Sequence, residues 1–339
     1  MWITTRIIAA CVPNINVRLV AGGVVLLEAV ALAVFLAWLL RGDGDPSTDA
    51  GAEAASAQTA VSATPAAPAT ETPAPTTVRD GCGGSIDGEF FAANQVLSYY
   101  GNPYVDTMGI LGELSPEDLV ASVRDHARAY DALNGHRGMV PALHLVYGTA
   151  QPEPGREGKY LLYVDDETLR EYIDLACRNK LLIFLDMQIG RSDVEAEVRK
   201  VLPYMRDSHV QLALDPEFAM PPGEVPGETI GALDAADINT AQRLVQDYVK
   251  EHRLPDKIIV VHQFEDGMIT QREMIQDYPR VRLVIDMDGY GPAEIKEVKY
   301  GWYAAPAEYA GIKLFFKHDP DLLSESDVLA LNPDVIIYQ

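Results

Sequence analysis

The chain is poor in positive charge. Its 339 residues carry 27 Lys and Arg against 50 Asp and Glu, which leaves a formal net charge of −23. Because binding to polyphosphate requires clustered positive charge, this balance excludes a nucleic-acid partner as the default. Apolar residues make up 48% of the chain and charged residues 23%, a balance typical of a globular protein with a buried core.

Several catalytic motifs are also missing. The chain has no Gly-x-Ser-x-Gly nucleophile elbow, no His-Glu-x-x-His helix and no glycine-rich phosphate loop between a strand and a helix. These absences argue against a serine hydrolase of the elbow type, a zincin and a nucleotide-binding fold. We predict no cofactor and no resident metal.

Cysteine is scarce, with Cys11, Cys82 and Cys177 as the only three. If Cys11 is cytoplasmic and the other two lie in an oxidising compartment, Cys82 and Cys177 can form one disulfide. Sequence spacing alone leaves this pairing open.

One long apolar run stands near the N-terminus. Residues 19–40 contain Glu28 as their only charge, and 22 helical residues are long enough to cross a hydrocarbon core of about 30 Å. Arg6 and Arg18 precede the run, whereas acids follow Arg41, so we predict a transmembrane helix with residues 1–18 in the cytoplasm. Residues 41–80, rich in Ala, Pro and Thr, form a predicted disordered stalk, and residues 81–339 form the predicted extracytoplasmic domain.

Strand and helix signals alternate through that domain. Strands are expected at residues 96–100, 140–146, 181–186, 210–215, 258–262, 282–286, 312–316 and 335–338. Helices are expected at residues 116–133, 166–179, 193–206, 235–252 and 269–278, with a poorly periodic stretch at 292–310. This α/β alternation predicts a (β/α)8 TIM-like barrel, with a doubly wound open sheet as the alternative.

Polar side chains follow the apolar strands at their carboxyl ends. The runs LLIFLDMQ, VQLALDPE, IIVVHQ and RLVIDMDG each pass from apolar residues directly into acids, amides or histidine. Side chains alternate along a strand, so Asp186 shares a face with Gln188, and Asp286 with Asp288. In a barrel these groups gather at the C-terminal mouth. The predicted site comprises Tyr99, Tyr100, His144, Asp186, Gln188, Asp215, Glu217, His262, Asp286, Asp288 and Lys313.

Several motifs carry a resemblance. YYGNP, YGTAQPEPGREGKY, LDMQIGRS, LALDPEF, VVHQF, DMDGYG, IKLFFKHD and PDVIIYQ resemble a group of exported or membrane-anchored bacterial proteins with a glycoside-hydrolase-like barrel. The resemblance covers roughly residues 95–339 and implies a fold without an established reaction. Asp215-Pro216-Glu217 is also similar to the end of the strand-four motif of chitinase-like barrels, which implies that Glu217 is the proton donor.

The carboxylates favour glycosidic bond cleavage of a cell-envelope or extracellular polysaccharide. Such cleavage needs one protonated carboxylic acid and one group that stabilises the positive sugar centre. Glu217 is the expected acid and Asp215 the neighbour that raises its pKa. Asp186 and Asp288 are candidates for the second carboxylate or for binding sugar hydroxyls. The other predicted site residues would bind the sugar. A divalent-metal hydrolase using the same Asp, Glu and His residues, or a glycan-binding display module without catalysis, are the alternatives.

Overall fold

The computed structural model describes residue 82 and residues 85–339. The predicted cytoplasmic segment, transmembrane helix and stalk therefore lie outside the described residues. Within the described part of the chain, no helix has both the length and the apolar character needed to cross a membrane.

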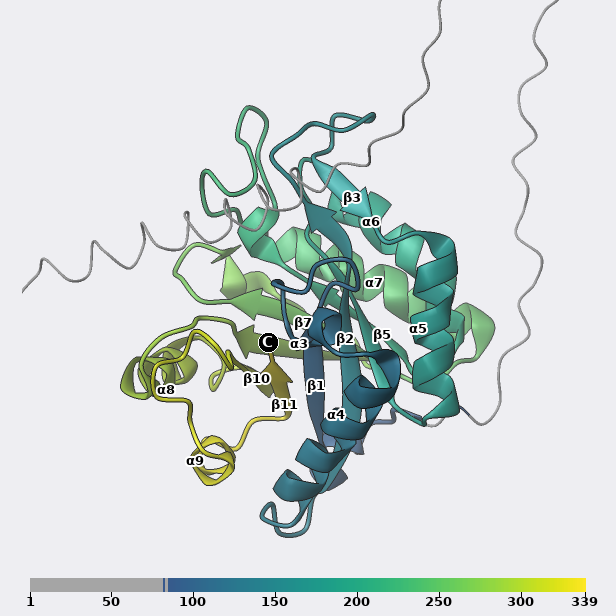
Figure 1. Cartoon of the computed structure of the whole chain (residues 1–339). Coiled ribbons are helices and arrows are strands. Elements are labelled where there is room, and N and C mark those ends of the chain that lie inside the picture. The colour runs from purple at the N-terminus through teal and green to yellow at the C-terminus, as the bar shows by residue number, and fades with distance from the viewer. Residues whose placement is uncertain (1–81, 83–84) are drawn as a thin grey trace, which may run out of the picture.

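The described residues form a closed eight-stranded parallel barrel, which confirms the fold predicted from the sequence (Figure 1). Its strands are β1 (Asn94–Gly101), β2 (Gly138–Ala150), β4 (Leu182–Met187), β5 (Val210–Leu214), β7 (Lys257–Gln263), β9 (Val281–Met287), β10 (Tyr309–Leu314) and β11 (Val335–Tyr338). The first strand closes the barrel by pairing in parallel with both β2 and β11. Each of the eight predicted strands matches one of these strands.

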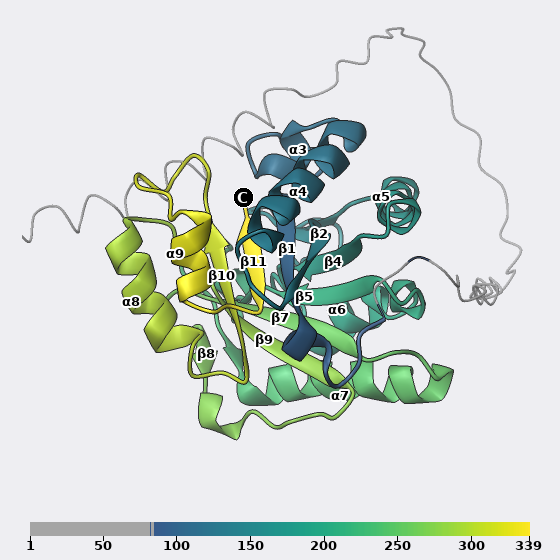
Figure 2. The same cartoon turned by 90° about the horizontal axis from the view of Figure 1, so that it is seen from below.

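Helices surround the barrel (Figure 2). They are α3 (Ile110–Glu113), α4 (Pro116–Asp131), α5 (Asp166–Arg178), α6 (Val194–Val201), α7 (Ala235–His252), α8 (Ala293–Tyr303) and α9 (Glu325–Ala330). Ser115, Asp165, Asp193, Asp234 and Ser324 each accept a backbone hydrogen bond at the start of a helix. These caps fix where five of the helices begin after their connecting loops.

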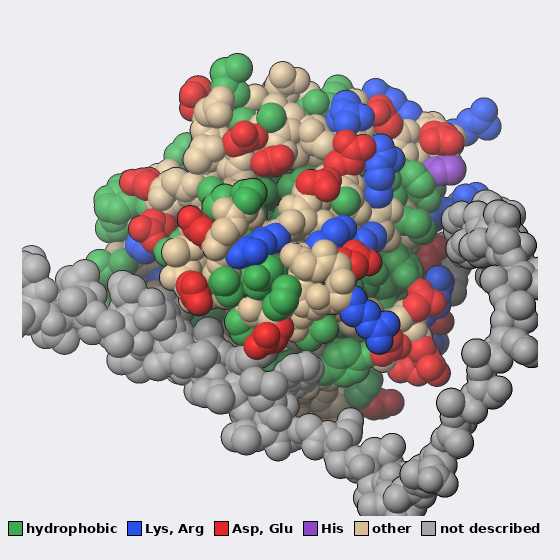
Figure 3. Space-filling model, turned by 90° about the horizontal axis from the view of Figure 1, so that it is seen from above, with side chains coloured by type: hydrophobic (Ala, Val, Ile, Leu, Met, Phe, Trp, Pro, Cys, Tyr) green, Lys and Arg blue, Asp and Glu red, His purple; other side chains and the backbone are tan. Residues whose placement is uncertain are grey.

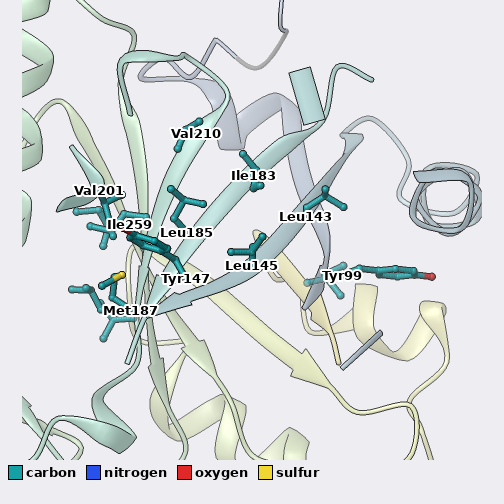
Figure 4. Close-up of a cluster of buried hydrophobic side chains, with 14 of the residues drawn as sticks. Tyr99, Leu143, Leu145, Tyr147, Ile183, Leu185, Met187, Val201, Val210 and Ile259 are labelled. Atoms are coloured by element: carbon teal, nitrogen blue, oxygen red, sulfur yellow. The ribbon is translucent and has the colours of Figure 1, made fainter. Parts of the chain in front are cut away.

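Each strand divides its side chains between two apolar regions. Outward side chains such as Leu143, Leu145, Ile183 and Leu185 belong to the cluster drawn in Figure 4. Inward side chains fill the barrel and form a second, smaller cluster. The strands are therefore buried on both faces, which explains their nearly continuous apolar runs.

The N-terminal end of the barrel is closed by residues that precede β1. Ile86, Phe90 and Phe91 pack with the inward-facing cluster, the last two from the short helix α2 (Phe90–Ala93). Cys82 and Cys177 form a disulfide that ties this segment to α5, a pairing that the sequence had left open. With this end closed, the strands present their polar residues at the opposite, C-terminal end.

Two predicted helices differ from the structure. The helix predicted at 269–278 is wrong: Ile269–Thr270 form β8, which pairs with β6 (Leu233–Asp234), and Arg272–Met274 form a single 3-10 turn. Asn239 and Gln242 of α7 hydrogen-bond to the backbone of Met274 and Gln276, so helix side chains replace the missing internal hydrogen bonds.

The helix predicted at 193–206 is shorter than expected. It ends at Val201, and after Pro203 only a 3-10 turn, Tyr204–Arg206, follows. Proline cannot donate a backbone hydrogen bond within a helix, which is consistent with this break. A short antiparallel strand that the sequence did not reveal, β3 (Leu161–Tyr163), pairs with the long end of β2.

Candidate functional site

The polar residues predicted from the strand ends lie in two layers inside the C-terminal half of the barrel. The deeper layer contains His144, Asp186, His262 and Asp286, all with no exposed surface. The upper layer, nearer the mouth, contains Tyr100, Gln188, Asp215, Glu217, Asp288 and Lys313. Figure 3 shows one face of the molecule, on which acidic, basic and apolar side chains are mixed.

In the deeper layer, Asp186 stands between two histidines. One of its carboxylate oxygens, Oδ2, lies 3.3 Å from Nε2 of His144 and 3.3 Å from Nε2 of His262. The other ring nitrogen of His262, Nδ1, lies 2.9 Å from a carboxylate oxygen of Asp286. Four strands, β2, β4, β7 and β9, thus bring four ionisable side chains together with no contact to solvent.

A glycine makes room for this layer. A Cβ atom at Gly311 of β10 would lie 2.7 Å from Oδ1 of Asp286 and 3.1 Å from its Cα. Because Gly311 is paired with Asp286 across the β9–β10 ladder, no larger residue fits without moving the carboxylate or the strand.

Asp215 and Glu217 stand next to each other in the upper layer. The carboxylate of Asp215 accepts a hydrogen bond from the backbone N–H of Glu217 at 3.0 Å, and Pro216 starts a 3-10 turn between them. The amide of Gln188 donates to the other Asp215 oxygen at 3.3 Å and accepts from the backbone of Ala150 at 2.9 Å. Asp215 is therefore held in place, and Glu217 is carried further out by the turn.

Asp288 and Lys313 form an ion pair beside these acids. The ammonium nitrogen of Lys313 lies 3.1 Å from one oxygen of Asp288 and 3.6 Å from the ring centre of Tyr100. Asp288 is 9% exposed and Asp215 3%, whereas Glu217 is only partly buried. Of the carboxylates predicted for the site, Glu217 is the one best placed to meet a molecule at the mouth.

Burial and mutual repulsion control the protonation of the upper acids. Burial, followed by the charges of Asp215 and Asp288, raises the pKa of Glu217 well above its ordinary range. Burial also raises the pKa of Asp215 to about 7. The positive charge of His262 lowers this pKa, whereas the negative charges of Asp186 and Asp288 raise it further. Both acids thus hold protons at pH values where free carboxylic acids are ionised.

The pKa values of the residues in the deeper layer are shifted in different directions. Burial lowers the pKa of His144, and the nearby carboxylate of Asp186 only partly opposes this effect. Burial alone would lower the pKa of His262 too, but Asp186 and Asp286 raise it well above its ordinary value. Although burial acts against ionisation of Asp186, the neighbouring His262 and His144 lower its pKa below the ordinary value.

Tyr99 does not belong to the site, and its predicted place at the mouth is corrected. Its ring points outward and packs against His126, Phe316 and Tyr338. Figure 4 accordingly draws Tyr99 in the outward-facing cluster. Because side chains alternate along a strand, Tyr100 points inward, and its ring lies 5.1 Å from that of His144.

A buried pair outside the predicted site supports the loop after β9. Lys296 of α8 donates to the backbone oxygen of Gly289 at 2.6 Å and pairs with Asp319. That loop also carries Tyr290, whose pKa is raised by burial and then by the charge of Glu217, so its phenol lies within electrostatic reach of this acid. Lys296 lies in the poorly periodic stretch at residues 292–310, where no local pattern indicates that a lysine is buried.

Comparisons with known proteins assign this chain to no family. No protein-family model matches the chain. No curated protein matches it either. Among solved structures, oxaloacetate acetylhydrolase is 12% identical with a TM-score of 0.44, covering 77% of this chain and 81% of that one. The lyase 2,3-dimethylmalate lyase, a PEP mutase/isocitrate lyase superfamily member, is 13% identical with a TM-score of 0.40, covering 74% and 77%.

The similar solved structures also include a glycosidase. Endo-glycoceramidase II from Rhodococcus sp. is 12% identical with a TM-score of 0.39, covering 76% of this chain and 75% of that one. All three proteins are enzymes by name. At these low identities and scores the similarity assigns no reaction to this chain.

Proposed function

We propose that the protein is a glycoside hydrolase whose barrel mouth cleaves a polysaccharide, with Glu217 as the general acid. The observation that carries this proposal is the Asp215-Glu217 pair. It places the carboxyl group of a partly buried residue, with its pKa raised well above the ordinary range, beside a second buried acid. Glycosidic bond cleavage requires a carboxylic acid that remains protonated near neutral pH.

In the proposed reaction, Glu217 gives its proton to the glycosidic oxygen as the bond from that oxygen to the anomeric carbon breaks. The positive charge that develops on the sugar is stabilised by a nearby carboxylate. Water then supplies hydroxide to the anomeric carbon, and its remaining proton returns to the carboxylates. The products are a reducing sugar and a free hydroxyl group.

Asp288 is better placed than Asp186 to act as the second carboxylate. Asp186 is enclosed between the two histidines and has no exposed surface, so a sugar at the mouth does not reach it. Asp288 is in the upper layer, and its charge contributes to the raised pKa of Glu217. Where a barrel glycosidase of the retaining type often carries a nucleophilic Glu, β10 supplies Lys313, which pairs with Asp288. This arrangement favours direct attack of water on the anomeric carbon over a covalent glycosyl-enzyme intermediate.

The proposed substrate is a glycan of the cell envelope or the extracellular space, because we propose that the barrel lies outside the membrane. The apolar run at residues 19–40 and the stalk that follows it support this location. The Cys82–Cys177 disulfide supports it as well, since disulfides persist in oxidising compartments.

The test compares the full-length chain with two variants on a panel of envelope and extracellular polysaccharides. Glu217→Gln keeps the size of the side chain and removes the proton donor, and Glu228→Gln makes the same change at an exposed position of the following loop. We expect new reducing ends from the wild type and Glu228→Gln, with a loss of at least about 100-fold in Glu217→Gln. Equal activity of both variants would overturn the proposal. Glycan binding without any product would favour the display module.

Metal-dependent hydrolysis is the second candidate function. The observation that favours it is the deeper layer, where His144, Asp186 and His262 place potential ligand atoms within 4.8 Å of one another. The two candidates differ in their response to chelators. Cleavage abolished by a chelator and restored by a divalent ion would favour the metal hydrolase.

A further inference from the structure

We propose that His144, Asp186 and His262 bind one divalent transition-metal ion of the Zn²⁺ class below the mouth of the barrel. This binding site is a statement about the deeper layer and does not depend on the proposed glycoside hydrolysis. A chain that binds zinc but cleaves no glycan would support this inference and count against the proposed function.

The spacing of the ligand atoms matches a tetrahedral ion. Oδ2 of Asp186 lies 3.3 Å from Nε2 of His144 and 3.3 Å from Nε2 of His262. With bonds of about 2.0 to 2.1 Å, two ligands of a tetrahedral zinc ion are separated by about 3.3 to 3.4 Å. The two distances are therefore those expected along the edges of such a coordination sphere.

Hydrogen bonding within the protein does not account for the polar atoms of these three side chains. Both ring nitrogens of His144, both carboxylate oxygens of Asp186 and Nε2 of His262 are buried and have no hydrogen-bond partner among the described residues. Buried polar atoms without partners are costly, and most are paired in folded proteins. A bound cation would satisfy a nitrogen from each histidine and an oxygen of Asp186 at one point.

The surroundings of His262 support a ligand role. Its Nδ1 lies 2.9 Å from the carboxylate of Asp286, so this nitrogen donates a hydrogen bond and Nε2 is left facing Asp186. Metal-binding histidines commonly donate their second ring N–H to a carboxylate in this way. The ring of His144 is held as well, since it stacks on Phe184 with 5.2 Å between ring centres.

A second set of ligands in the barrel is less suitable. His262, Asp286 and Asp288 also lie within ligand distance of one another. However, Nδ1 of His262 and Oδ2 of Asp286 already hydrogen-bond to each other, and Asp288 pairs with Lys313. The choice of ion follows from the donors: two imidazoles and one carboxylate suit zinc and its neighbours better than magnesium or calcium. Water would complete the coordination.

The experiment measures metal binding by the full-length chain in a mild non-ionic detergent, with no affinity tag. The protein is stripped with EDTA, dialysed against micromolar Zn²⁺ and analysed for zinc per chain. A parallel sample with Co²⁺ is read for the visible absorption of a four-coordinate ion. His144→Gln removes an imidazole ligand, and Asp186→Asn replaces the carboxylate ligand by a neutral amide. Asp286→Asn removes the negative charge that faces Nδ1 of His262, and Glu217→Gln is the control in the upper layer.

We expect one zinc ion per chain in the wild type and in Glu217→Gln, and loss of the ion in His144→Gln and Asp186→Asn. Asp286→Asn should weaken zinc binding by about 10- to 100-fold, the usual effect of losing such a partner. Zinc retained by both ligand variants would overturn the inference. If a ligand variant does not fold, the Co²⁺ spectrum of the wild type decides: a four-coordinate spectrum supports the site, and no protein-bound Co²⁺ overturns it.

Discussion

The ammonium nitrogen of Lys296 lies 3.0 Å from the carboxylate of Asp319, and both side chains are almost completely buried. Asp319 also accepts backbone hydrogen bonds from Gly291 and Phe315, each at 2.9 Å. The pair therefore connects α8 to the segments that follow β9 and β10. Because Asp288 and Tyr290 lie in the first of these segments, the pair positions one wall of the proposed site.

Lys296→Met should destabilise the protein by about 3 to 5 kcal/mol, because it leaves the buried Asp319 carboxylate without its cation. The control is Lys317→Met, which breaks an exposed ion pair with Glu113 and should cost less than about 1 kcal/mol. Chemical denaturation at neutral pH measures both values. Equal, small losses for the two variants would show that the buried pair contributes no more than a surface contact.

The close approach at Gly311 gives a second prediction. Gly311→Ala places a Cβ atom 2.7 Å from Oδ1 of Asp286, so we expect a loss of about 1 to 3 kcal/mol from strain. Gly301→Ala in α8 is the matched control, since nothing lies within 4 Å of its added Cβ and alanine favours a helix. Thermal and chemical denaturation should show Gly311→Ala below the wild type and Gly301→Ala equal to or above it. The reverse order would contradict the geometry.

Much of the barrel could be predicted because its strands are buried on both sides. The runs that became β4, β5, β7 and β9 are apolar and end in polar residues, which gives both the strands and the position of the site. The rule of alternation predicted that Asp286 and Asp288 share a face, and in the structure both carboxylates lie near Nδ1 of His262, at 2.9 Å and 3.4 Å. These features depend on local sequence alone.

Other features depend on contacts between distant segments. Adjacent tyrosines at 99 and 100 have the same strand preference, and only the register of β1 decides that Tyr100 points inward. The division of the acids into two layers likewise follows from how far each strand extends. The segment at 269–278 has helical spacing, but α7 side chains bind its backbone in a non-helical form. Local spacing carries none of this information.

The raised pKa of Asp215 links stability to pH. Its ordinary value of 3.8 is raised to about 7 in the folded protein, so the folded state binds more protons than the unfolded state between these values. Stability contributed by this group is therefore present at low pH and is lost as the pH rises through about 7. Asp215→Asn, which stays neutral, should become more stable than the wild type as pH rises, by an amount on the order of a few kcal/mol above pH 7.

Urea denaturation of both proteins at several pH values between 4 and 9 checks this prediction about Asp215. The difference in unfolding free energy should favour the wild type or be small at acid pH, where its carboxyl group is also protonated. It should shift towards Asp215→Asn as the pH increases. A difference that stays constant over the whole range would mean that Asp215 has an ordinary pKa in the folded protein.

The same substitution should also change the pH dependence of catalysis. If Glu217 is the general acid, kcat/KM falls on the alkaline side as Glu217 loses its proton in the free protein. Because the charge of Asp215 helps to raise the pKa of Glu217, Asp215→Asn should move that alkaline limb to lower pH. Glu228→Gln, which removes an exposed charge in the following loop, should leave the limb in place. A profile unchanged by Asp215→Asn would separate the alkaline limb from Glu217 and require another proton donor.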